Sequence, residues 1–188
     1  MRPLKDLYWI KIGIETENSI SLGGTKIYLD SSYDPMRHTR QYGIVEETPV
    51  LDSLELDIEV GDKIWFHHFV ADDSNKVDIH PSDDIYQAHS NQIYARERAG
   101  KMSTVGSWNL IEQKVNKGTE STSGLTLNDK GDDVVLQGKA VYLSLGIASQ
   151  GVKGDDDVIF SKDSEYDMDI NGVSLLRMRD NDILAIYE

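Results

Sequence analysis

Short runs of apolar residues, each bounded by turn-forming residues, recur along the chain. Four of them are rich in β-branched and aromatic side chains: Leu7–Ile14, Lys63–Val70, Ala140–Leu145 and Val173–Met178. Runs of this length between Gly, Asp, Asn or Pro predict β-strands. Helix-period stretches of ten or more residues are scarce. The pattern therefore predicts an all-β protein built from small barrels or sandwiches.

The two halves of the chain carry similar landmarks in the same order. The chain ends on Asn181–Glu188, and a similar segment, Asn91–Glu97, closes the first half. Upstream, each half has an opening strand, a polar loop with a glycine and a small apolar triplet, a further strand, and an acidic turn before an aromatic strand. Such self-similarity predicts two domains of one design, residues 1–97 and 104–188, with a short linker at 98–103.

Composition and charge exclude several classes of function. The 188 residues are 39% hydrophobic, as in globular proteins, but 33 acidic against 19 basic residues argue against a nucleic-acid partner. No cysteine is present, so disulfides and thiolate metal sites are excluded. No run approaches the ~18 apolar residues that span a bilayer, and Met1–Asp6 does not begin a targeting signal. We expect no membrane partner and a cytoplasmic location.

Three segments resemble motifs of the GroES-type co-chaperonins, which cap chaperonin rings. Arg2–Asp6 is similar to the opening motif of that family, Val60–Asp62 to its Val-Gly-Asp turn, and Asp182–Ile186 to its closing strand. The resemblance implies two tandem GroES-like small irregular β-barrels, as in the chloroplast tandem co-chaperonin. It also implies a homo-oligomeric ring that binds a GroEL-type chaperonin. The roof hairpin of the family would lie within Val45–Val60, whereas Ser144–Gly154 leaves less room for one. Divergence and the tandem form suggest a phage-encoded protein, which would act in the host cytoplasm.

Two long polar segments, about Glu15–Gln41 and Lys114–Gln137, are candidate mobile loops, because loops of this length are either functional or disordered. The resembled family inserts an apolar tripeptide of such a loop into a groove of the chaperonin. The resemblance makes the candidate chaperonin-binding residues Ile27, Tyr28 and Leu29 in the first loop and Leu125, Thr126 and Leu127 in the second, beside the loop glycines Gly23, Gly24 and Gly124. A strand that packs on its own barrel is the alternative for both triplets.

Metal and enzyme chemistry find little support in the residues. His67 and His68 are adjacent, and neighbouring residues of a strand point to opposite faces, so they cannot easily share one ion. Asp155–Asp157 lacks the spacing of an EF-hand loop, and no zinc spacing is present. Dinucleotide and nucleophile-elbow motifs are missing too. We therefore expect no enzyme, no metal and no cofactor of its own, with ATP and ADP bound by the partner chaperonin.

The sequence favours a co-chaperonin that closes an ATP-dependent folding chamber. Two other classes stay open. One is a ring-forming structural or assembly protein, for example in a virus, that keeps the fold without chaperonin docking. The other is a β-barrel that binds a small ligand or carbohydrate. The long loops discriminate between the first two classes, because a lid needs loops that are mobile until a chaperonin is added.

Overall fold

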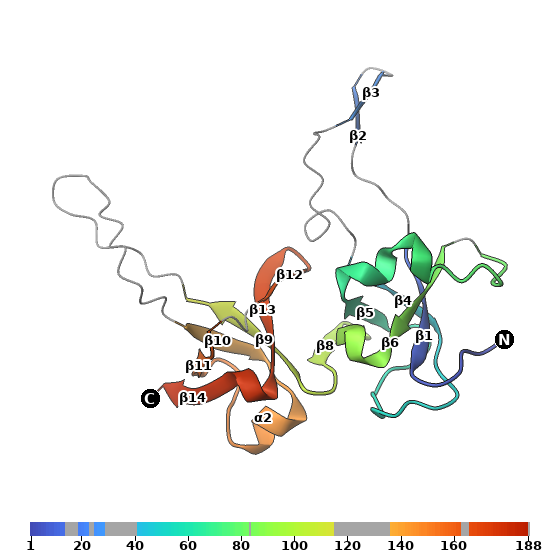
Figure 1. Ribbon diagram of the computed structural model, residues 1–188. Coiled ribbons are helices and arrows are strands. Elements are labelled where there is room, and N and C mark those ends of the chain that lie inside the picture. The colour runs from blue at the N-terminus through green and yellow to red at the C-terminus, as the bar shows by residue number, and fades with distance from the viewer. Residues whose placement is uncertain are drawn as a thin grey trace. The chain divides into compact units, whose positions relative to one another are not determined.

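The computed structural model describes residues 1–13, 19–22, 25–28, 41–82, 84–114, 136–162 and 166–187. This part of the chain is all-β and divides into two compact units, Met1–Val105 and Gly106–Glu188 (Figure 1). Each unit contains one six-stranded antiparallel sheet. Within the described residues, no helix has the length and apolar character to cross a membrane.

The sheet of the first unit has the strand order β6-β1-β4-β5-β7-β8. Its elements are β1 (Leu7–Lys11), β4 (Tyr42–Glu47), β5 (Lys63–Phe66), β6 (Ile85–His89), β7 (Ile93–Arg98) and β8 (Lys101–Thr104), with the 3-10 helices η1 (His68–Ala71), η2 (Asp73–Asn75) and η3 (Ser90–Gln92). Tyr8, Ile10, Ile64, Phe66 and Ile93 are fully buried in its core. Residues 98–103, which we expected to link two domains, instead include the end of β7 and most of β8.

The sheet of the second unit has the strand order β12-β13-β9-β10-β11-β14. Its elements are β9 (Trp108–Gln113), β10 (Gln137–Tyr142), β11 (Asp157–Phe160), β12 (Tyr166–Ile170), β13 (Val173–Arg179) and β14 (Ile183–Tyr187), with the short helix α2 (Leu145–Ser149) and the 3-10 helix η4 (Asp180–Asp182). Its core includes Ile111, Ala140, Val158 and Phe160.

Five strands follow the same spatial order in the two sheets. The order is β6-β1-β4-β5-β7 in the first unit and β13-β9-β10-β11-β14 in the second. The registers repeat as well. Ile10 pairs with Val45 as Ile111 pairs with Ala140. Phe66 pairs with Ile93 in the first unit, and Phe160 pairs with Ile183 in the second, with an irregularity one residue earlier in both. The two units thus share strand order, pairing and bulge positions.

A glycine holds the same tight position in each sheet. A Cβ atom on Gly43 would lie 2.6 Å from Ile10 Cγ2 and 2.7 Å from the carbonyl oxygen of Lys11. One on Gly138 would overlap the side chain of Ile111 and lie 2.8 Å from the carbonyl oxygen of Glu112. Only glycine leaves room for this close approach of two strands.

Two predicted strands end earlier than the apolar pattern indicated, because a capping side chain starts a helix within each run. Lys63–Val70 stays a strand only to Phe66, and His67 Nδ1 then accepts a hydrogen bond from the Phe69 N–H at 3.2 Å. Ala140–Leu145 ends as a strand at Tyr142, where Ser144 Oγ accepts from Ile147 N–H at 3.0 Å. Apolar composition alone does not reveal such caps.

We argued against an ion shared by His67 and His68 because we expected both to lie on one strand, and that expectation was wrong. Both lie beyond β5, and their rings stack with centroids 4.3 Å apart. Even so, the described residues contain no group of three or more His, Asp or Glu side chains arranged to hold a metal ion.

Candidate functional site

The two long polar loops leave the sheet at the same place in each unit, between the first two paired strands. In the first unit Gln41 ends the loop, and its carbonyl oxygen accepts from Phe66 N–H at 2.9 Å. The Leu136 carbonyl accepts from Phe160 N–H in the second unit at 3.0 Å, and Lys114 N–H donates to the Gln137 carbonyl at 3.1 Å. Each loop therefore ends on residues tied into its own sheet.

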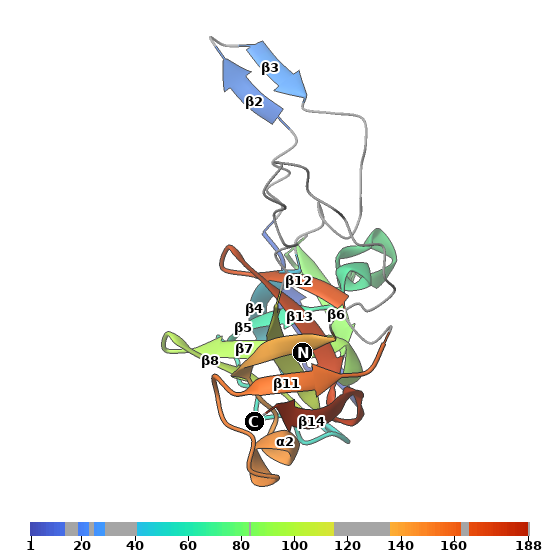
Figure 2. The ribbon, with the colours of Figure 1, turned by 90° about the vertical axis from the view of Figure 1, so that its left-hand side faces the viewer.

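Part of the first loop forms a two-stranded ribbon, β2 (Ser19–Leu22) and β3 (Thr25–Tyr28), drawn side by side in Figure 2. Ile20 pairs with Ile27 and Leu22 with Thr25, so Gly23 and Gly24 alone connect the strands in sequence. Among the described strands, β2 and β3 pair only with each other. The backbone of Ile27 and Tyr28 therefore lies outside the six-stranded sheet of the unit.

The other predicted docking residues lie outside the described residues, and so do the side chains of Ile27 and Tyr28. They are Leu29, Leu125, Thr126 and Leu127, with the glycines Gly23, Gly24 and Gly124. The docking role of all these residues stays a prediction.

The connection from β4 to β5, where we expected a roof hairpin, folds onto its own unit. Asp52 anchors it by accepting hydrogen bonds from the Tyr8 hydroxyl at 2.6 Å and from Leu56 N–H at 2.8 Å. Burial and the neighbouring Asp52 carboxylate raise the pKa of Tyr8 far above its ordinary value, so the hydroxyl stays a donor. No strand is present between Glu47 and Lys63, all of which the structure describes. The predicted hairpin is therefore wrong here.

Asp6, the last residue of the opening motif, fastens the same connection from the other side. Its carboxylate accepts hydrogen bonds from the Ser53 N–H at 2.5 Å and from Ser53 Oγ at 3.1 Å, and its own N–H donates to the Leu51 carbonyl. The Ser53 N–H is the main cause of a lowered pKa at Asp6. The resemblance of Arg2–Asp6 to an opening motif did not indicate this anchoring role.

The acidic turn before β5 recurs before β11 with the same hydrogen bonds. The Asp62 carboxylate accepts from Glu59 N–H at 2.8 Å, and the Asp156 carboxylate accepts from Lys153 N–H at 2.8 Å. The carbonyls of both aspartates accept hydrogen bonds from the preceding strands, from Val45 and Ala140, at 2.9 Å. The Val-Gly-Asp resemblance therefore marks a turn that exists in both units.

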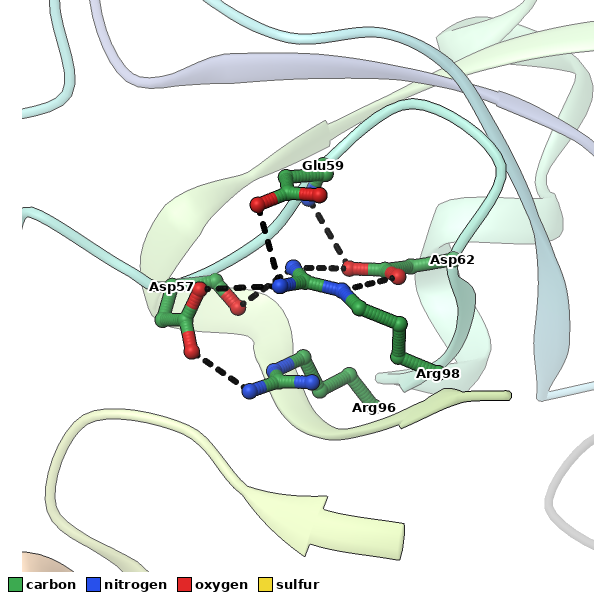
Figure 3. Close-up of polar contacts among 5 residues, drawn as sticks. All are labelled: Asp57, Glu59, Asp62, Arg96 and Arg98. Atoms are coloured by element: carbon green, nitrogen blue, oxygen red, sulfur yellow. Dashed lines mark hydrogen bonds and ion pairs between the residues drawn. The ribbon is translucent and has the colours of Figure 1, made fainter. Parts of the chain in front are cut away.

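Charge is distributed differently around the two turns. In the first unit Arg98 donates from Nε and Nη2 to the two oxygens of buried Asp62, both at 2.8 Å, and Nη1 donates to Glu59 at 3.0 Å (Figure 3). Asp57 joins the cluster through Arg98 and, at 2.5 Å, through Arg96 (Figure 3). In the second unit the register places Ile186 where the first has Arg96. The cluster ties the acidic turn of the first unit to β7.

This cluster controls the ionisation of Asp62. Burial by itself raises the pKa of Asp62, but the hydrogen bonds from Arg98 and Glu59 N–H and the charge of Arg98 outweigh it, so the pKa lies below its ordinary value of 3.8. A carboxyl with a lowered pKa stabilises the fold above pH 3.8, and that contribution is lost as the pH falls through the lowered value.

Arg98→Met is expected to make the first unit unfold at higher pH during acid titration, because Asp62 then keeps its burial without its counter-charge. Circular dichroism and hydrogen exchange measure the shift in the pH of unfolding, across about pH 2–6, where carboxyl groups titrate. Lys139→Met is the matched control. Lys139 binds Asp155 at 3.0 Å, but that carboxylate is 85% exposed, and little change is expected. Equal acid midpoints for the wild type and Arg98→Met would contradict the role of the cluster.

Residues 101–187 match the family described as the chaperonin 10 Kd subunit. The match runs from β8 to β14, so it covers the whole sheet of the second unit. It supports a GroES-type family for this part of the chain and, in general terms, a co-chaperonin role. The chaperonin 10 family is not known as a family of enzymes. No curated protein matches the chain.

Proposed function

We propose that this chain is a co-chaperonin that caps a chaperonin ring and closes its ATP-dependent folding chamber. The observation that carries the proposal is the family match over residues 101–187.

The proposal includes two tandem GroES-like barrels, with the first unit as a divergent copy of the second. Its support is the shared order of five strands, the shared registers, and the equivalent glycines Gly43 and Gly138. Small residues recur at such tight positions because a side chain there would separate two strands. Residues 1–97 and 104–188 were the predicted domains, and a boundary near Val105 now fits the compact units better.

Docking is proposed to use the two apolar triplets, Ile27-Tyr28-Leu29 and Leu125-Thr126-Leu127. Each loop lies in sequence between the first two paired strands of its unit, so the two triplets belong to corresponding loops. A loop that becomes ordered on docking loses conformational entropy, which keeps each contact weak. Several copies in one homo-oligomeric ring raise the effective concentration of the remaining loops, so the whole lid binds firmly.

The chaperonin would supply the nucleotide chemistry, since ATP and ADP bind to the partner and the lid needs no cofactor. We place the complex in the cytoplasm, and in the host cytoplasm for a phage-encoded chain. The high negative charge argues against a nucleic-acid partner.

Protease protection of a captive client tests the closing of the chamber. An unfolded client bound to a bacterial chaperonin is digested in the open ring. Adding this chain with ADP is expected to slow digestion of the client by about tenfold or more, since the protease cannot reach an enclosed client. A client digested at the same rate with and without the chain would contradict the lid function, and would favour the alternative of a structural or assembly ring without docking.

A further inference from the structure

The register of the ribbon β2–β3 divides its residues between two faces. The cross-strand pairs are Ser19 with Tyr28, Ile20 with Ile27, Ser21 with Lys26, and Leu22 with Thr25. Directly paired residues of an antiparallel ribbon lie on the same face, and successive residues of a strand alternate between the faces. The apolar face therefore carries Ile20, Leu22, Thr25 and Ile27, and the polar face carries Ser19, Ser21, Lys26 and Tyr28.

This division differs from the order of residues in the sequence. The candidate docking triplet runs through Ile27, Tyr28 and Leu29, but the register places Tyr28 on the polar face. Ile20 and Leu22 lie outside the triplet and precede the loop glycines, yet they share the apolar face with Ile27. The register therefore adds two residues of β2 to the apolar face and removes the middle residue of the triplet from it.

The two candidate triplets share one alternating pattern in the sequence. Each has an aliphatic residue, then a residue with a hydroxyl group, then another aliphatic residue, in Ile27-Tyr28-Leu29 and in Leu125-Thr126-Leu127. In an extended chain the first and third residues share a face and the middle residue lies on the other. The alternation is therefore what a docking strand needs when only one of its faces meets an apolar partner.

A ribbon with one apolar face gains stability when an apolar surface covers that face. Among the described strands, β2 and β3 pair only with each other, and an isolated two-stranded ribbon is marginally stable in water. Covering the apolar face removes its residues from water, which is favourable, and leaves the polar face hydrated. The proposed co-chaperonin function supplies such a surface, the apolar groove of a chaperonin ring.

We infer that the apolar face of the ribbon docks on the chaperonin, that Ile20 and Leu22 of β2 bind together with Ile27, and that Tyr28 does not take part. The inference rests on the proposed co-chaperonin function and names further binding residues for it. A ribbon that is paired before docking loses less conformational entropy than an unpaired loop. Residues 116–123, which precede Gly124 in the second loop, include no large apolar residue. The first loop is therefore expected to bind more tightly than the second.

Substitutions at adjacent residues on the two faces test the inference. Ile20→Asp is expected to weaken binding to an immobilised chaperonin with ADP by about tenfold or more, because it puts a charge on the apolar face. Ser21→Asp adds the same charge to the polar face and is expected to change Kd by less than about twofold. Biolayer interferometry measures both. Wild-type affinity of folded Ile20→Asp, while Ile27→Asp fails to bind, would overturn the inference and leave the proposed function intact.

A disulfide within the ribbon tests its register without a chaperonin, because the chain contains no cysteine of its own. Ser19→Cys with Tyr28→Cys places two thiols at a direct pair of the polar face. The Cα atoms of such a pair lie about 4.5–5.5 Å apart, within the range that a disulfide accepts. The pair Ile20→Cys with Tyr28→Cys joins opposite faces and is expected to oxidise at least ~tenfold more slowly. Equal oxidation rates for the two pairs would overturn the inference.

Binding of the cross-linked chain tests whether the paired ribbon is the form that docks. The oxidised variant with Ser19→Cys and Tyr28→Cys is expected to bind the chaperonin at least as tightly as its reduced form, because the disulfide fixes the ribbon and spares the apolar face. Loss of binding on oxidation, with the reduced variant still bound, would overturn the inference and leave the proposed function standing. A wild-type chain that binds no chaperonin would contradict the proposed function itself and remove the partner that the inference assigns to the ribbon.

Discussion

Ile27→Asp is expected to abolish binding of the chain to a chaperonin ring while both units stay folded. Ile27 lies on β3, which pairs with β2 and not with the six-stranded sheet, so a change there spares the core. A buried carboxylate in an apolar groove has no counter-charge and costs several kcal/mol, roughly the free energy of a weak single contact. Because several copies dock together, the loss is multiplied around the ring. Leu29→Asp is expected to act in the same way.

Ser21→Asp is the matched control for the docking prediction. It adds the same charge to the same two-stranded ribbon, at a residue that pairs with Lys26 and is not part of the apolar triplet. Biolayer interferometry with an immobilised chaperonin and ADP compares the variants, and circular dichroism confirms that they are folded. Leu127→Asp in the second loop is expected to cause a smaller loss, because Thr126 interrupts that triplet. Binding of folded Ile27→Asp at the wild-type level would remove the triplet from the docking site.

Gly138→Ala is expected to destabilise the second unit severely. Its Cβ would overlap Ile111 and press on the Glu112 carbonyl oxygen, which belongs to the paired backbone of β9 and cannot move alone. Overpacking of this kind costs about 1–3 kcal/mol and sometimes more, against a total of about 5–15 kcal/mol for a domain. Gly43→Ala is expected to have the same effect in the first unit, because Gly43 meets Ile10 and Lys11 in the same way.

Gly154→Ala is the control for the glycine prediction, since a Cβ there would meet nothing within 4 Å. Urea unfolding followed by hydrogen exchange and mass spectrometry separates peptides of the two units. Gly138→Ala should lose protection in β9, β10 and β11 at lower urea than the wild type, while Gly154→Ala should follow the wild type. The same urea midpoint for both variants would contradict the close approach of β9 and β10.

Much of the fold follows from local sequence. The apolar runs locate β1, β5, β10 and β13, and the repeated acidic turn marks the entry to β5 and β11. Strand β8 was missed because its hairpin turns on Ala99 and Gly100, at φ +52° and +75°, rather than on an Asn-Gly pair. The charged run around it is typical of a linker. Caps at His67 and Ser144 also went unnoticed, because their effect depends on a backbone N–H two or three residues later.

Part of the candidate site can likewise be predicted from local sequence, and part cannot. A short motif can suggest a docking triplet, since apolar residues beside glycine in a long polar loop form a local pattern. The cluster of Arg98 and Asp62 has no local pattern, because its partners are 36 residues apart and meet only when β7 pairs with β5. Asp6 and Ser53 are separated by 47 residues and come together for the same kind of reason. Contacts of this kind depend on the tertiary fold and cannot be predicted from spacing.

Native mass spectrometry of the chain with a bacterial chaperonin and ADP tests the co-chaperonin function most directly. The function predicts one complex whose mass equals the chaperonin plus a ring of whole chains, and the mass difference counts those chains. Omitting ADP should weaken the complex, since the partner holds the nucleotide. A stable ring of this chain that leaves the chaperonin mass unchanged, with ADP present and both units folded, would contradict the co-chaperonin function.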